Sequence, residues 1–116
     1  MIRIIFDTNS LIYSLKYRID LFSEIERICQ FQYTLGVLDT TLKELERLQP
    51  KGLALIKKYC EKMQVIKAEE SYVDDELARL SKLGNIIVTQ DQGLKKKLKG
   101  PLITIRQKKY LELKRM

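Results

Sequence analysis

Four acidic residues have the types and the spacing to share one site. Asp7 and Asp91 each follow a short apolar segment closely, and Glu44 and Asp74 lie near the expected starts of helices. Carboxylates that gather at one place repel one another unless a cation neutralises them, so such a group predicts a metal site. The chain has no histidine, and oxygen ligands favour hard cations such as Mg²⁺ or Mn²⁺.

A cation held by these acids would supply hydrolytic chemistry. It can lower the pKa of a bound water and stabilise the charge that develops on a phosphate. The absence of histidine also removes the commonest general base and the serine–histidine nucleophile systems. The pattern therefore favours metal-assisted hydrolysis over covalent catalysis.

Each acid also has a structural interpretation as a helix cap. Acids at helix N-termini accept hydrogen bonds from free backbone N–H groups and suit the helix dipole. Residues 41–44 fit a capping box and residues 71–74 resemble one, while Asp91 could cap a basic helix. Taken singly, capping competes with catalysis at these positions, and the joint pattern is what favours a metal site.

Short apolar runs and helical periodicity indicate the elements that must position the acids. The expected strands cover residues 2–6, 33–37, 86–89 and 102–105, with a brief edge strand at 65–66. Helices are expected to begin at residues 8, 21 and 39, the last ending at Pro50, and to cover residues 51–63, 73–83 and 91–98. Alternating strands and helices predict a mainly parallel sheet covered on both faces, whose ligands bind at the carboxyl ends of the strands. Residues 107–116 could form a helix or a basic tail.

Positive charge is concentrated at the end of the chain. Of the net charge of +7, residues 95–116 contribute +8, because nine basic side chains there face one acid, and the first 94 residues contribute −1. Such a field is expected where a protein meets a phosphate backbone, although a solvated tail is the alternative. Lys95, Lys96 and Lys97 are the best candidates for contacts with such a backbone, because their helix starts beside Asp91.

Length and composition predict one domain over residues 1–116, with a basic C-terminal segment at 95–116. The chain is 45% hydrophobic and 32% charged, which is typical of a globular protein. No apolar run approaches the roughly 20 residues of a membrane-spanning helix, and the first residues do not resemble a secretory signal. We therefore expect a cytoplasmic protein with no membrane partner, in which Cys29 and Cys60 are buried and reduced.

The chain resembles the PIN-domain nucleases over nearly its full length. Four blocks carry the resemblance in order and at matching distances: residues 4–9 (IIFDTN), 42–48 (LKELERL), 73–77 (VDDEL) and 87–91 (IVTQD), the last followed by a lysine-rich helix. The DTN block alone would be a weak signal, whereas all four together are fairly specific.

The resemblance implies a three-layer α/β/α sandwich around a mainly parallel sheet. It also implies an endoribonuclease that depends on Mg²⁺ or Mn²⁺ and cuts single-stranded RNA. The catalytic and metal-binding acids of the family match Asp7, Glu44, Asp74 and Asp91. Asp75 is a rival or an auxiliary for the third acid, and Asn9 and Thr89 match positions that help to orient the acids.

Several functions stay open within this resemblance. The lysine-rich helix and residues 103–111 look most similar to the branch related to ribosomal RNA-processing PIN proteins of archaea and eukaryotes. A ribonuclease toxin with an antitoxin partner is an alternative, although the helix at 76–80 is less rich in alanine than toxin-branch members often are. A non-catalytic RNA-binding or ribosome-assembly factor is another. Homodimers are common among similar proteins.

A phosphoacceptor receiver domain is disfavoured. It would also gather acids at the ends of strands in a doubly wound sheet, but it needs an acceptor aspartate at the end of a middle strand. The strand at 33–37 offers only Asp39, which we expect to lie in a loop.

Overall fold

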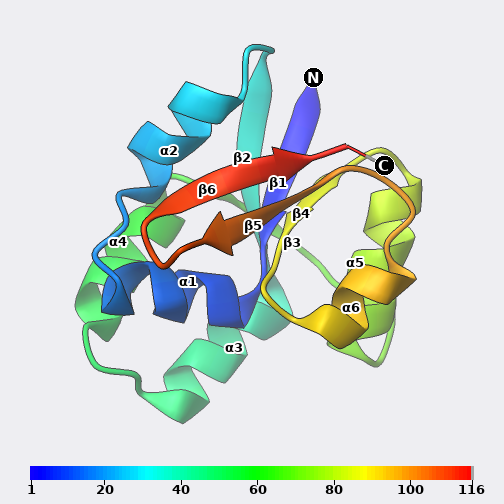
Figure 1. Ribbon diagram of the computed structural model, residues 1–116. Helices are drawn as coiled ribbons and strands as arrows, with labels where there is room; N and C mark the ends of the chain where they lie inside the picture. The colour runs from blue at the N-terminus through cyan, green and yellow to red at the C-terminus, as the bar shows by residue number, and fades with distance from the viewer. Residues whose placement is uncertain (116) are drawn as a thin grey trace.

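A mixed, mostly parallel β-sheet forms the centre of the molecule, and helices cover both of its faces (Figure 1). The computed structural model describes residues 1–115. The strands are β1 (Ile2–Phe6), β2 (Tyr33–Leu38), β3 (Gln64–Ile66), β4 (Ile86–Val88), β5 (Leu102–Arg106) and β6 (Tyr110–Lys114). The helices are α1 (Thr8–Lys16), α2 (Leu21–Ile28), α3 (Asp39–Leu48), α4 (Leu53–Glu61), α5 (Val73–Lys82) and α6 (Gln92–Lys97). The predicted three-layer α/β/α sandwich is confirmed.

The order of the strands brings the ends of the central strands together. The sheet runs β3-β2-β1-β4-β5-β6, and every neighbouring pair is parallel except β5 and β6. Phe6, the last residue of β1, is in register with Val37 of β2 on one side and with Val88 of β4 on the other. Residues that follow β1 and β4 therefore emerge side by side at the same edge.

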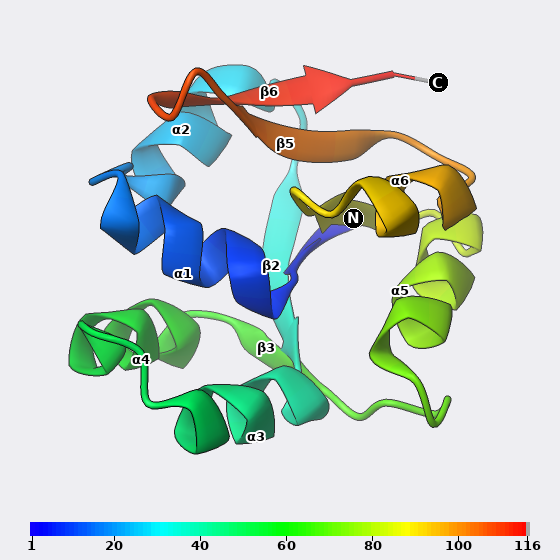
Figure 2. The same ribbon diagram turned by 60° about the horizontal axis from the view of Figure 1, so that its bottom comes forward.

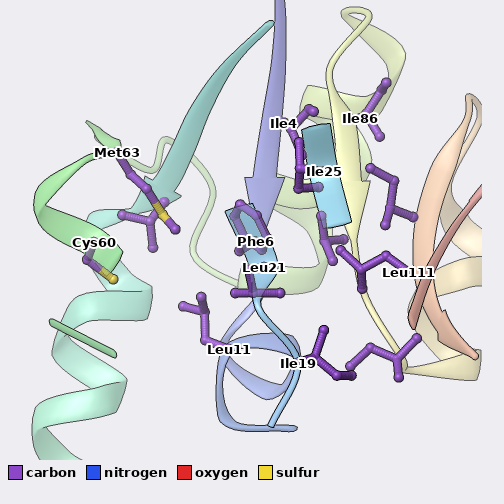
Figure 3. Packing of buried hydrophobic residues seen from close by; sticks show 14 of the residues in the cluster. Ile4, Phe6, Leu11, Ile19, Leu21, Ile25, Cys60, Met63, Ile86 and Leu111 are labelled. Atoms are coloured by element: carbon purple, nitrogen blue, oxygen red, sulfur yellow. The ribbon is translucent and has the colours of Figure 1, made fainter. Parts of the chain in front are cut away.

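The side chains of β1 alternate between two cores, as a strand buried on both faces requires. Ile4 and Phe6 pack into a core covered by α1, α2, α3 and α4, where Leu21 and Ile25 are fully buried (Figure 3). Ile5 points to the other face and joins a smaller core with residues of α5 and α6. Figure 2 shows these two groups of helices on opposite sides of the sheet.

Residues 107–115 form neither a helix nor a tail, so both expectations for this segment are wrong; Met116 lies outside the described residues. Gln107 and Lys108 have φ of +53° and +56°, and the Lys109 N–H donates to the carbonyl oxygen of Arg106 at 3.0 Å. Positive φ at both central residues belongs to a type I′ hairpin turn. The turn sends β6 back antiparallel to β5.

Two side chains of α2 hold the outer edge of β6. The backbone N–H of Leu111 donates to Glu24 Oε1 at 2.9 Å, and Arg27 Nη2 donates to the Leu111 carbonyl oxygen at 2.9 Å. Unpaired strand edges are unfavourable when buried and invite association when exposed. The Glu24–Arg27 pair thus satisfies backbone groups that no further strand reaches, which explains why the last residues add to the sheet.

The structure also bears on the two cysteines and on the expected absence of a membrane-spanning helix. Cys29 and Cys60 are buried and form no disulfide, as predicted. Across residues 1–115, none of the helices has both the length and the apolar character needed to cross a membrane.

Candidate active site

Asp7 lies at the carboxyl end of the central strand and caps α1. Its Oδ1 accepts the backbone N–H of Ser10 at 2.7 Å, and its own N–H donates to the Val88 carbonyl oxygen at 3.1 Å. The residue is only 7% exposed. Burial raises the pKa of Asp7 above its ordinary value, while hydrogen bonds from Thr89 and Ser10 act in the opposite direction and the nearby charge of Asp91 raises it further. An ionised carboxylate here is therefore costly unless positive charge approaches it.

Asp91 caps α6 beside Asp7. Its Oδ1 accepts the backbone N–H groups of Gly93 at 2.8 Å and Leu94 at 3.2 Å. The Asp91 backbone N–H donates to Thr89 Oγ1 at 3.0 Å, and the Thr89 side chain is fully buried. The same hydroxyl lowers the pKa of Asp7. Thr89 therefore lies between Asp7 and the backbone of Asp91.

Asn9 has no comparable contact. It lies in the first turn of α1, is exposed, and makes no side-chain hydrogen bond with residues 1–115. Its orienting role stays a prediction.

The other acids lie on α3 and α5. The N-termini of both helices lie at the edge of the sheet where β1 and β4 end (Figure 2). Glu44 of α3 faces Arg47, with 3.8 Å between Oε2 and Nη2. Asp75 of α5 faces Lys97, with 3.8 Å between Oδ1 and Nζ. Asp74 and Asp75 help to line a hollow of about 430 Å³ with Lys97.

The structure brings Asp7 and Asp91 together but does not gather all the predicted ligands. In the part of the chain that the structure describes, no group of three or more acids, cysteines or histidines could hold one ion. The participation of Glu44 and of Asp74 or Asp75 stays a prediction.

The capping boxes predicted for Glu44 and Asp74 are absent. Helix α3 begins at Asp39, two residues before Thr41, so Thr41 lies inside the helix. The N-cap of α5 is Tyr72, and no side chain caps either helix. Capping therefore accounts for Asp7 and Asp91, and it does not account for Glu44 or Asp74.

Asp39 begins a helix, as predicted, so the loop position expected for it in comparison with a phosphoacceptor is wrong. It is the first residue of α3 and follows β2 directly, with no loop between them. Its Oδ1 accepts backbone N–H groups of Thr40 at 2.7 Å and Ala68 at 3.1 Å. These bonds tie the residues after β3 to the start of α3, which is a structural use of the carboxylate.

The three candidate RNA-binding lysines occupy three different environments. Lys95 is half-buried and its Nζ donates to Thr104 Oγ1 at 2.9 Å. Burial lowers the pKa of Lys95, the charges of Lys114 and Arg106 lower it further, and Asp7 raises it, so the ammonium lies within electrostatic reach of that acid. Lys96 is exposed, and Lys97 faces Asp75.

A buried acid that the sequence did not single out positions the start of α5. Glu76 is fully buried; its Oε1 accepts Arg79 Nε at 2.8 Å, and its Oε2 accepts the Glu69 N–H at 2.8 Å. These bonds join the segment before α5 to the first turns of the helix, which carry Asp74 and Asp75. The only signal in the sequence was the Glu–Arg spacing of three, which is common on exposed helix faces.

Replacing Glu76 by Gln should destabilise the fold by about 2 kcal/mol at neutral pH, because charge-assisted bonds to Arg79 and Glu69 are lost. The hydrogen bond from Arg79 lowers the pKa of Glu76 in the folded protein. Its contribution is therefore complete above the ordinary pKa of the carboxyl and is lost as the pH falls through the lowered value. Urea unfolding at neutral and acidic pH measures both effects. Glu61→Gln, at an exposed position on α4, is the matched control, and equal stability of the two variants would contradict this role.

Comparisons with known proteins identify the family and the fold. Residues 4–108 match the family model described as a PIN like domain. The protein named Ribonuclease VapC4, from Methanocaldococcus jannaschii, is 34% identical, and the match covers 97% of each chain. A solved structure titled as the PIN domain endonuclease Utp24 superimposes with a TM-score of 0.81 at 21% identity, covering 98% of this chain and 92% of the other. At that identity the likeness concerns the fold.

Proposed function

Since the chain belongs to the PIN-domain family of ribonucleases, we propose that it is a metal-dependent endoribonuclease that hydrolyses phosphodiester bonds of single-stranded RNA. The observation that carries the proposal is the pair formed by Asp7 and Asp91 at the ends of adjacent central strands. The Thr89 hydroxyl accepts the Asp91 N–H between the two acids, and the partly buried Lys95 lies within electrostatic reach of Asp7.

The Asp7–Asp91 pair has the chemistry that a hard divalent cation requires. Both side chains offer carboxylate oxygens, and Asp91 Oδ2 has no hydrogen-bond partner among residues 1–115. Burial and mutual repulsion oppose ionisation of Asp7, and a cation would offset both. Asp7 and Asp91 would hold Mg²⁺ or Mn²⁺, with Glu44 and either Asp74 or Asp75 as the remaining ligands.

Each residue has a distinct task in this proposal. A bound divalent ion supplies an activated water and stabilises charge on the phosphate. Asp7 and Asp91 would hold the ion, and the Thr89 hydroxyl, which accepts the Asp91 backbone N–H, would help to position them. Lys95, whose ammonium is within electrostatic reach of Asp7, would neutralise charge on the scissile phosphate, and Lys96 and Lys97 would contact the adjoining RNA backbone.

Cleavage of a labelled single-stranded RNA should require Mn²⁺ or Mg²⁺ and stop when a chelator is added. An ion that binds only the folded protein should also raise its stability, by about 2.7 kcal/mol at a hundred times its Kd. Cleavage assays and thermal unfolding with each ion measure the two effects. Undiminished cleavage in chelator contradicts the metal requirement, and RNA binding without cleavage under every condition would instead support the non-catalytic binding factor.

Two biological roles have specific support. The likeness of the basic C-terminal segment to processing proteins favours ribosomal RNA processing. The 34% identity with Ribonuclease VapC4 favours a toxin with a cognate antitoxin. Accumulation of ribosomal RNA precursors in cells depleted of the protein would support the first role. Growth arrest on expression, relieved by a co-expressed antitoxin, would support the second. A single domain, a cytoplasmic location and a homodimer stay predictions.

A further inference from the structure

A second hollow is lined by residues of α1, of β5 and of the turn that joins β5 to β6. Figure 1 shows where α1 and this turn lie. Its volume is about 470 Å³. The residues that line it are Tyr13, Tyr17, Gln90, Ile105, Gln107 and Lys108. Two phenol rings, one cation and two amides thus share a space that none of the predicted catalytic acids lines.

The tyrosines of this hollow offer an aromatic surface next to positive charge. The rings of Tyr13 and Tyr17 stack with 5.9 Å between centroids and an interplanar angle of 15°. Tyr13 remains 36% exposed. Lys108 Nζ lies 5.6 Å from the centre of the Tyr17 ring, and Lys16 Nζ lies 5.7 Å from it. Aromatic faces beside cations are the combination that proteins use to bind single-stranded nucleic acid.

The walls of the hollow are held by hydrogen bonds. The side-chain amide of Gln90 donates to the Ile105 carbonyl oxygen at 3.2 Å and accepts the Ile105 N–H. The positive φ values of Gln107 and Lys108 belong to the hairpin turn, which fixes where Lys108 leaves the backbone. A surface ordered in advance loses less entropy on binding.

Residues that line the hollow are close in sequence to Asp7 and Asp91. Gln90 lies between Thr89 and Asp91, and α1 carries Tyr13 six residues after its cap, Asp7. At a rise of about 1.5 Å per residue, Tyr13 lies roughly 9 Å along the helix from Asp7. An RNA strand with one phosphate at the acids would therefore bring a neighbouring nucleotide to the tyrosines.

We propose that this hollow binds an unpaired base of the RNA strand near the scissile phosphate. The base stacks on the exposed face of Tyr13, and Lys108 and Lys16 neutralise a neighbouring phosphate. Every base has a π-face, and the amide of Gln90 is already bonded to β5. The site therefore selects unpaired RNA and discriminates weakly between bases. This inference rests on the proposed function, because RNA is its ligand.

Binding of a labelled single-stranded oligoribonucleotide to the Asp7→Asn protein tests the site without cleavage. Adding Tyr13→Ala should weaken binding about five- to a hundredfold, as expected for loss of one stacked base. Tyr13→Phe should bind within about twofold of the parent, because stacking needs the ring and not the hydroxyl. Tyr13→Leu, which is apolar but not aromatic, should resemble Tyr13→Ala. Melting temperatures show whether the variants remain folded.

An abasic nucleotide scanned along the RNA locates the contact. At one position it should weaken binding to protein with Tyr13 and have no further effect on Tyr13→Ala. Equal affinities of Tyr13→Ala and Tyr13→Phe would overturn the site even if the wild type cuts RNA. Tyr13-dependent binding by a protein that never cuts RNA would keep the site and overturn the nuclease. Absence of RNA binding by the wild type and by Asp7→Asn would overturn the site and direct attention to a protein ligand.

Discussion

Asp7→Asn should reduce RNA cleavage by about a thousandfold or more and leave the fold intact. Loss of one carboxylate at the metal site removes several kcal/mol of transition-state stabilisation, and each 1.36 kcal/mol corresponds to about tenfold in rate. Asparagine has the same shape and caps helices about as well as aspartate, so the bond to the Ser10 N–H can persist. Single-turnover cleavage with saturating Mn²⁺ measures the effect.

The same substitution makes a prediction about stability. The pKa of Asp7 is raised by burial, so stability without metal should fall as the pH rises through the ordinary and then the raised pKa. Asp7→Asn removes this dependence and should unfold, in chelator at neutral pH, at a temperature equal to or above that of the wild type. Added cation should stabilise the wild type and not the variant.

Asp20→Asn is the matched control for Asp7→Asn. Asp20 also caps a helix, because its Oδ1 accepts the Ser23 N–H at the start of α2 at 3.2 Å, but its side chain is exposed. This variant should cut RNA at the wild-type rate. Full activity of Asp7→Asn would remove Asp7 from the metal site.

Replacing Lys95, Lys96 and Lys97 together by alanine should weaken RNA binding by tenfold or more. Each phosphate contact on a single strand contributes roughly 0.7 to the slope of log affinity against log salt, so the slope should fall by about 2 if all three contacts are lost. Titrations at several salt concentrations measure it. The single variants should differ, because Lys95 is bonded to Thr104 and Lys97 faces Asp75, whereas Lys96 is exposed.

A variant with the same change in charge elsewhere controls for the net field. Three exposed lysines lie in or next to α4: Lys51 in the turn before it, Lys58 within it and Lys62 at its C-cap. Their joint replacement by alanine should change the salt slope much less. Equal slopes in the two triple variants would show that general charge governs binding, and an unchanged slope in the first would place the RNA footprint elsewhere.

Local patterns in the sequence were sufficient to predict most of the elements. The apolar run of β1 followed by Asp7, and the segment of β4 followed by Asp91, both lie where they were expected. Helix and strand periods are properties of neighbouring residues, and N-caps depend on the next few N–H groups. A local pattern also gave a wrong prediction at Glu44. Residues 41–44 have the sequence of a capping box, but the helix begins two residues before Thr41.

Contacts between distant residues decided the rest of the fold. Strand β6 follows a turn without glycine, and the side chains that hold its edge, Glu24 and Arg27, lie more than eighty residues away. No local pattern records such a partner. Glu76 resembled a surface acid until the fold placed Arg79 and the Glu69 N–H around it.

The sequence by itself determined which acids are candidates for the site, where the positive charge is concentrated and how strands and helices alternate. Only the tertiary structure decided that Asp7 and Asp91 lie close together beside Thr89, that the three lysines differ, and that Tyr13 and Lys108 line one hollow. The physical reason is that periodicity and capping act over a few residues. Strand order and side-chain burial instead depend on which segments, far apart in the chain, bury their apolar faces together.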